Sequence, residues 1–139
     1  MNDSPLDTFR VEKHAGEYKD FGLSDDDPYP LRGVTYPCDY GDIEDYIGED
    51  GANLDFFMGN DGDKFGFIKV TRPELSDGEH KFYARLTDEE VAAVQGAFAP
   101  VVIEHVSLQS EKDLLLAIEP FRKASYTTIG SIICQSSPV

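Results

Sequence analysis

Two carboxylates beside a glycine are the side chains of this sequence best suited to chemistry. Asp50 is followed by Gly51, and Asp55 comes shortly afterwards. A tight turn at Gly51 would present both carboxylates to one space, and hard cations such as Mg²⁺ prefer oxygen ligands of this kind. Acids beside glycine also mark ordinary solvated turns. These residues alone therefore leave open both a metal site and a surface turn.

The two acids belong to a longer pattern of two blocks. The first block is Tyr36-Pro37-Cys38-Asp39-Tyr40-Gly41, and the second is Glu49-Asp50-Gly51-Ala52-Asn53-Leu54-Asp55. Their order and spacing resemble the signature of the family I soluble inorganic pyrophosphatases, in which a Tyr-Pro-x-Asn-Tyr-Gly stretch precedes Asp-Gly-Asp-Pro-x-Asp. Residues 66–69 are similar to the Gly-hydrophobic-hydrophobic strand of that family, and residues 79–81 to its Asp-x-Lys. The resemblance is carried by residues 33–81.

The resemblance implies Mg²⁺-dependent hydrolysis of inorganic pyrophosphate to two phosphates. It implies Asp50, Asp55 and Glu79 as metal ligands, and Asp50, Asp55 and Tyr40 as catalytic residues. The side chains that it implies for binding the substrate are Arg32, Tyr36, Lys69, Lys81 and Arg122. In such chemistry, metal-bound water ionises near neutral pH and attacks phosphorus, while Lys and Arg hold the phosphate oxygens.

Three positions depart from the family pattern. Ala52 stands where the family has an Asp that binds metal and helps to activate the attacking water, and loss of a general base typically costs ~100- to 10,000-fold in rate. Asp77 and Glu12 are the acids that the sequence offers as replacements. Asp39 replaces the usual Asn, and Arg32 is out of register with the family's substrate-binding arginine. These departures bear on the activity more than on the fold.

Two other functions stay open for these reasons. A relative that keeps the fold but binds a phosphorylated ligand or a protein partner without turnover would explain Ala52. An acidic protein that mimics nucleic acid would fit the net charge. Individual residues also have plainer interpretations: Tyr36 as a core aromatic, and Lys69 and Lys81 as solvated strand residues.

The formal net charge of -15 restricts the partners of the chain. Binding to the phosphate backbone of nucleic acid requires Lys and Arg in excess, so we expect no nucleic-acid partner. An anionic substrate would need bound cations or a local basic cluster. The sequence has no apolar run of membrane-spanning length and starts without the pattern of a signal peptide, so we expect a cytoplasmic protein with no membrane partner. A homo-oligomer stays open. Cys38 and Cys134 have no metal-ligand spacing and are expected to be reduced thiols.

The strands are predicted to come early in the chain. They are expected at residues 9–13, 33–37, 54–58, 66–70 and 81–86, with residues 40–51 irregular. The turn at residues 59–62 predicts a hairpin between the third and fourth strands. A calcium loop there lacks the terminal Glu of an EF-hand.

Two helices are predicted late in the chain. Thr87 and Glu90 form a capping-box pattern for a helix that ends at Pro100, with Val91, Val94 and Phe98 on one face. A buried strand is expected at residues 101–103. The second helix is expected to start after Ser110 and to end near Pro120. Together with the resemblance, this order predicts a single α+β domain over residues 1–139: a small, mostly antiparallel, OB-like barrel of the pyrophosphatase type with two C-terminal helices.

Overall fold

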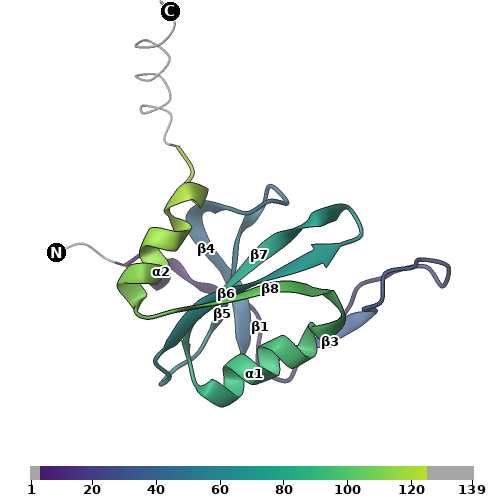
Figure 1. The fold of residues 1–139 in the computed structure, drawn as a ribbon, viewed down its shortest axis with the longest axis horizontal. Helices are drawn as coiled ribbons and strands as arrows, with labels where there is room; N and C mark the ends of the chain where they lie inside the picture. Colours follow the sequence, from purple (N-terminus) through teal and green to yellow (C-terminus); the bar gives the residue numbers. More distant parts are fainter. Residues whose placement is uncertain (1–3, 125–139) are drawn as a thin grey trace, which may run out of the picture.

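The architecture is α+β, with a mostly antiparallel sheet and two helices late in the chain. The structure is a computed structural model that describes residues 4–124 (Figure 1); Cys134 lies outside them. The strands are β1 (Arg10–Lys13), β2 (Tyr18–Asp20), β3 (Gly33–Thr35), β4 (Asp39–Ile47), β5 (Asn53–Met58), β6 (Lys64–Arg72), β7 (Leu75–Leu86) and β8 (Val102–Leu108). The helices are α1 (Asp88–Ala97) and α2 (Glu111–Ile118), with short 3₁₀ turns at η1 (Pro5–Thr8), η2 (Ala99–Val101) and η3 (Glu119–Phe121).

Six strands form one sheet in the order β1-β4-β5-β7-β6-β8, and β2 pairs with β3 in a separate two-stranded sheet. The pairs of the large sheet are antiparallel except for β5 and β7, which run parallel. The expected hairpin between residues 54–58 and 66–70 is therefore wrong, because β7 lies between those two strands. The turn that was expected to close the hairpin instead crosses the end of β7: the Gly59 amide donates to the Ala84 carbonyl, and the Gly62 amide to the Arg85 carbonyl.

Residues 40–51 are not irregular, because most of them belong to β4. Gly41 allows β1 to approach closely: a Cβ at this position would lie 1.7 Å from the Arg10 carbonyl oxygen. The pairing of β4 with β5 is interrupted near Asp45, which has a φ of 69°, and the register shifts between Asp42 and Ile47. The glycine and acidic residues that suggested a loop therefore mark a strand pairing and a bulge.

The capping box of the first helix is confirmed. The Thr87 hydroxyl accepts from the Glu90 amide at 3.1 Å, and the Glu90 carboxylate accepts from the Thr87 amide at 2.9 Å. The second helix begins after Ser110, as predicted, with the Ser110 hydroxyl accepting from the Asp113 amide at 3.2 Å. The expected buried strand at residues 101–103 is partly wrong, because β8 is an edge strand on which Ile103 is 53% exposed.

Alternation along the strands gives the sheet two apolar faces. Phe57 and Tyr83 share a cluster with Val94 and Phe98 at α1. The preceding residue on each strand, Phe56 or Phe82, belongs to a second cluster that includes Leu114 and Ile118 of α2. The period of two places neighbouring side chains on opposite faces, so α1 and α2 cover different faces, and Figure 1 shows them well apart.

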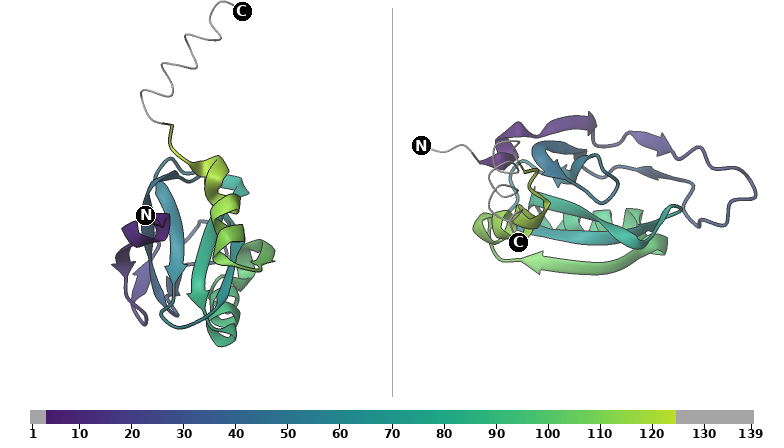
Figure 2. Two further views of the ribbon diagram at one scale, coloured as in Figure 1. Left: turned by 90° about the vertical axis from the view of Figure 1, so that its left-hand side faces the viewer. Right: turned by 90° about the horizontal axis from the view of Figure 1, so that it is seen from above.

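The described pairings leave the large sheet open, because β1 and β8 are its two edges and no pairing joins them within residues 4–124. A closed barrel is therefore not confirmed. Figure 2 shows β1 and β8 on opposite sides of the molecule, with the loop between β2 and β3 extending beyond one end of the sheet. Across the part of the chain that the structure describes, neither helix is long and apolar enough to span a membrane.

Candidate functional site

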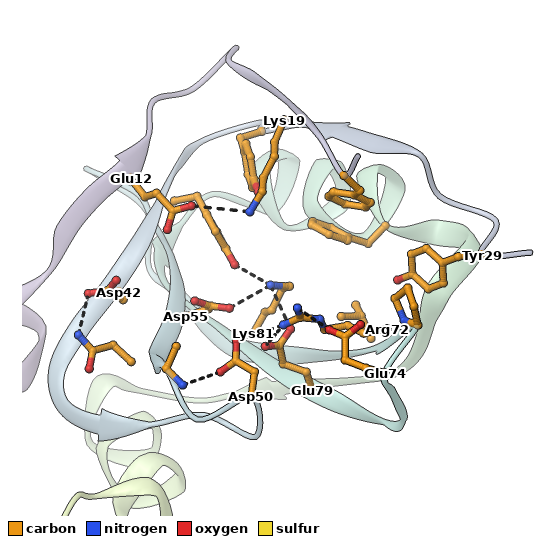
Figure 3. Close-up of a pocket in the computed structure, with 18 of the residues that line it drawn as sticks. Glu12, Lys19, Tyr29, Asp42, Asp50, Asp55, Arg72, Glu74, Glu79 and Lys81 are labelled. Carbon is orange, nitrogen blue, oxygen red and sulfur yellow. Dashed lines mark hydrogen bonds and ion pairs between the residues drawn. The ribbon is translucent and has the colours of Figure 1, made fainter. Parts of the chain in front are cut away.

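A cavity of about 330 Å³ opens on the α1 face of the sheet (Figure 3). Its floor consists of alternate residues from neighbouring strands, which the pleat turns to the same side. These are Tyr40 and Asp42 on β4, Asn53 and Asp55 on β5, Glu79 and Lys81 on β7, and Val70 and Arg72 on β6. Register brings them together, since Asp55 pairs with Lys81 and Val70 pairs with Glu79.

Three carboxylates meet in this cavity, and all three were predicted as metal ligands. One oxygen each of Asp50, Asp55 and Glu79 lie within 4.8 Å of one another. Asp55 and Glu79 come from adjacent strands, whereas Asp50 comes from the β4–β5 turn. The sequence pattern thus located a group of carboxylates that the fold assembles from three segments.

The β4–β5 turn fixes the position of Asp50. Gly51 has a φ of +82°, which side-chain-bearing residues rarely adopt. The Gly48 amide donates to the Ala52 carbonyl at 2.8 Å, and the Ala52 amide donates to Asp50 Oδ1 at 2.9 Å. Burial acts to raise the pKa of Asp50, but the hydrogen bonds from this amide and from Arg72 hold its pKa below the usual value. Asp50 is therefore an ionised carboxylate aimed into the cavity.

Lys81 compensates the charge of the two strand carboxylates. Its Nζ lies 3.1 Å from Asp55 Oδ2 and 3.4 Å from Glu79 Oε2, and it donates to the Tyr40 hydroxyl at 2.6 Å. The lysine side chain is only 10% exposed. Burial acts to lower the pKa of Lys81, but Asp55 and Glu79 outweigh burial and raise it, so the ammonium stays charged. Burial raises the pKa of Tyr40 well above its ordinary value, so its phenol remains a hydrogen-bond donor.

Arg72 is a functional candidate that the sequence reasoning missed. Its Nη1 lies 3.1 Å from Asp50 Oδ2 and 3.0 Å from Glu79 Oε1, while its Nη2 lies 2.7 Å from Glu74 Oε1. Arg72 belongs to no motif, and only the β6–β7 register places it over the carboxylates. The sequence feature that could have identified Arg72 is its spacing of two residues from Val70, because this spacing places both side chains on the same face of a strand.

Glu79 is the residue whose surroundings best fit a cation site. The residue is 2% exposed, and its Oε2 makes no hydrogen bond within the described residues. The 3.4 Å approach of Lys81 satisfies the distance of an ion pair but not the geometry of a hydrogen bond. Burial raises the pKa of Glu79, and Asp55 adds to this, while Lys81 and Arg72 oppose it. A buried carboxylate oxygen with no donor fits a cation, because carboxylate oxygens are what Mg²⁺ binds.

Tyr36 is a core aromatic, as its plainer interpretation expected, and substrate binding by it stays a prediction. It lines the cavity, and it is also a core residue that is 3% exposed and stacks on Tyr40 with ring centroids 4.6 Å apart. Burial raises its pKa to about 12. The tyrosine therefore supports the position of Tyr40 from within the core.

Three predicted substrate-binding residues do not line the cavity. Arg32 donates to the Ser24 and Asp27 carbonyls in the loop between β2 and β3. Lys69 lies on β6 opposite His80 and Glu104, on the other side of that strand from Val70. Arg122 donates to the Tyr46 hydroxyl at 2.8 Å, outside the cavity. Register and strand alternation direct these three side chains elsewhere.

Ala52 does line the cavity, so the position at which the family pattern has a third Asp faces the site. Of the two acids expected to replace it, Glu12 lies at the cavity wall, whereas Asp77 does not line it. Glu12 is on β1, with its Oε2 at 3.9 Å from Lys19 Nζ. Figure 3 shows Glu12 on the opposite wall from Asp50 and Glu79.

The cavity as a whole is negative. Six carboxylates and three basic side chains line it. The acids are Glu12, Asp42, Asp50, Asp55, Glu74 and Glu79, and the bases are Lys19, Arg72 and Lys81. Such a site attracts a cation, and it accepts an anion only together with a cation.

Comparison with known proteins leaves the chain without an assigned family. A scan against models of protein families, a search of curated proteins and a search of solved structures found no match. The geometry of this site is therefore the basis for proposing a function.

Proposed function

We propose that this cavity binds Mg²⁺ together with a diphosphate and hydrolyses the phosphoanhydride to two phosphates. The observation that carries the proposal is the meeting of Asp50, Asp55 and Glu79, with a buried Glu79 oxygen that has no hydrogen-bond donor among residues 4–124. The neighbouring Lys81 and Arg72 supply the positive charge that phosphate oxygens require.

The residues divide into two groups in this proposal. Asp50, Asp55 and Glu79 hold the cation, which when bound neutralises phosphate charge and lowers the pKa of water. Once the carboxylates are engaged by a cation, Lys81 and Arg72 can exchange their carboxylate contacts for phosphate oxygens. Arg72 suits this role because a guanidinium can bind two oxygens at once. Tyr40, whose phenol keeps its proton, donates to a phosphate oxygen.

A second candidate function is binding of a phosphorylated ligand without turnover. Ala52 favours it, because an apolar side chain occupies the cavity wall where a water-activating carboxylate would stand. Asp42 also lines the cavity, but Arg10 and Asn53 already engage its Oδ1 at 3.1 and 3.4 Å. Mimicry of nucleic acid rests on the net charge alone and is not part of the proposal.

Release of phosphate from pyrophosphate by the purified chain separates the two candidates. Hydrolysis should require Mg²⁺ and should fall at least ~100-fold in Asp50→Asn and Asp55→Asn. Lys69→Gln is the matched control, since this lysine is on β6 but outside the cavity, and it should retain the wild-type rate.

If the wild type shows no turnover, Ala52→Asp is the decisive variant. It introduces a carboxylate at a position that faces the cavity, and activity gained by this change would show that the site supports hydrolysis only with a carboxylate there, so that the wild type binds without turnover. Absence of turnover in both proteins, combined with metal-dependent pyrophosphate binding, would select the binding function. Absence of both turnover and binding would reject the proposal.

The proposed function goes with a proposed fold type, an OB-like barrel of the pyrophosphatase type. OB folds are five-stranded, partly open Greek-key barrels. The strand order supports the comparison, because the chain crosses over to insert β7 between β5 and β6. The open edges at β1 and β8 are the feature that does not match a closed barrel.

A further inference from the structure

The cavity has a second wall that the hydrolysis of pyrophosphate does not use. Its apolar members come mainly from the loop between β2 and β3 and from the region around α1. They are Phe21, Leu23, Tyr29, Pro73 and Phe98. The carboxylates and Lys81 lie on the floor, and in Figure 3 Tyr29 stands across the opening from Asp55. Asp50 and Asp55 therefore lie at one end of the cavity and Tyr29 at the other, with Arg72 and Glu74 between them.

The loop that carries this wall is held against the sheet. The Tyr29 hydroxyl donates to the Thr71 carbonyl on β6. Within the loop, Asp27 Oδ1 accepts from the Tyr29 amide at 2.9 Å. Arg32 donates to the Ser24 carbonyl at 2.9 Å and to the Asp27 carbonyl at 2.5 Å. These hydrogen bonds fix the position of the aromatic wall, and those from Arg32 hold the loop in shape.

The apolar wall is only partly covered by the chain itself. Phe21, Leu23 and Tyr29 are half-buried, and the rings of Phe21 and Tyr29 are 6.5 Å apart and tilted by 48°. Partly covered aromatic rings at the edge of a polar cavity are typical of sites that bind an organic group beside a charged one. The cavity volume of about 330 Å³ lies at the lower end of the ~300–1,000 Å³ found for small-molecule sites. A bare diphosphate would leave the aromatic end unused.

Charge points to the same kind of ligand. The lining carries three more acidic than basic side chains, which disfavours a highly charged anion. A diphosphate monoester has one ionisable oxygen fewer than inorganic pyrophosphate, because one oxygen is esterified. An ester therefore brings less repulsion into the cavity and places its organic group against the apolar wall.

We propose that the ligand of this site is a diphosphate monoester with a flat aromatic group, of the nucleoside diphosphate class. Its diphosphate lies with a divalent cation on the floor near Asp55, Glu79 and Lys81, and its ring system lies against Phe21 and Tyr29. This inference rests on the proposed function, since the same carboxylates hold the cation. What the inference adds to the proposed function is the aromatic group attached to the diphosphate.

Calorimetric titration at saturating Mg²⁺ tests the inference with two probes that cannot be hydrolysed at the bridge. Methylenediphosphonate presents the diphosphate alone, and α,β-methylene-ADP presents it with an adenosine group. The expected result is affinity about tenfold higher for the nucleotide analogue, the scale of one base–aromatic stacking contact. In Phe21→Ala this ratio should fall toward one.

Tyr18→Ala is the matched control, because Tyr18 is an aromatic residue of β2 that is 57% exposed and does not line the cavity. It should keep the wild-type ratio. Equal or tighter binding of methylenediphosphonate would overturn the inference while leaving the proposed function intact. Failure of both probes to bind would overturn the proposed function and the inference with it.

Discussion

Removal of the Lys81 ammonium is the perturbation for which the structure gives the clearest magnitude. Lys81→Met keeps the length and apolar character of the stem but deletes the charge that lies 3.1 Å from Asp55 and 3.4 Å from Glu79. Glu79 is 2% exposed, so its carboxylate cannot regain water. Removing one partner of a buried ion pair costs about 3–5 kcal/mol.

The lower end of that range applies here, because the Asp55 side chain is 20% exposed and Arg72 still contacts Glu79. We expect a loss of about 3 kcal/mol in the free energy of unfolding in EDTA. With a urea m-value of about 2 kcal/mol/M, the midpoint of unfolding should fall by about 1.5 M. The loss should shrink as the pH falls, because protonation of Glu79, whose pKa burial already raises, removes uncompensated charge.

Mg²⁺ should stabilise Lys81→Met more than the wild type, because the cation no longer competes with the ammonium for the carboxylates. Urea unfolding of both proteins with EDTA and with MgCl₂ measures this difference. Lys69→Met is the control: this lysine makes no ion pair within residues 4–124, and its replacement should change stability by no more than about 0.5 kcal/mol. If Lys81→Met were as stable as Lys69→Met in EDTA, the ammonium would not be compensating buried charge, and the electrostatic account of the cavity would be refuted.

Three further predictions concern the surroundings of the site and the fold. Glu49 accepts from both the His80 amide and the His80 ring and so connects the turn that carries Asp50 to β7. Glu49→Ala should therefore weaken Mg²⁺ binding about tenfold in calorimetry, whereas Glu119→Ala should not. Equal Mg²⁺ affinities of Glu49→Ala and the wild type would contradict this coupling. Burial lowers the pKa of His105, so folding favours the neutral ring. The stability of the wild type should therefore decline more than that of His105→Gln as the pH falls below about 6.5. Parallel pH profiles of the two proteins in urea unfolding would contradict a stabilising neutral ring. Thr87→Ala removes the capping hydroxyl of α1 and should cost about 1 kcal/mol in the free energy of unfolding, and an unchanged midpoint would show that the cap is not stabilising.

Local signals in the sequence located much of this site. The spacing of Asp50 and Asp55 predicted two carboxylates across a turn, and the similarity of residues 79–81 to the Asp-x-Lys of the pyrophosphatases predicted Glu79 and Lys81. The resemblance to the pyrophosphatase signature added Tyr36 and Tyr40, which line the same cavity. Capping chemistry was equally local, and both helix starts were predicted from Thr87 and Ser110. Each of these features depends on residues close together in the chain.

Pairing between distant strands could not be predicted in the same way. The turn after β5 looked like a hairpin, but β7 pairs with both β5 and β6 and separates them. Arg72 enters the cavity only because of this register, and Lys69, three residues earlier on the same strand, does not line it. Register depends on the burial of whole strand faces, which no single motif encodes. Arg32 was likewise predicted to bind substrate from its residue type and approximate position, whereas the structure shows that it donates to the Ser24 and Asp27 carbonyls of its own loop.

The most direct test of the account is the location of a bound cation. Crystals of the chain grown with MnCl₂, in which Mn²⁺ stands in for Mg²⁺, would show the metal by its anomalous scattering. We expect a peak at bonding distance from carboxylate oxygens of Asp50, Asp55 and Glu79, and loss of that peak in Glu79→Gln. A well-diffracting crystal with no anomalous peak among these three carboxylates would contradict it.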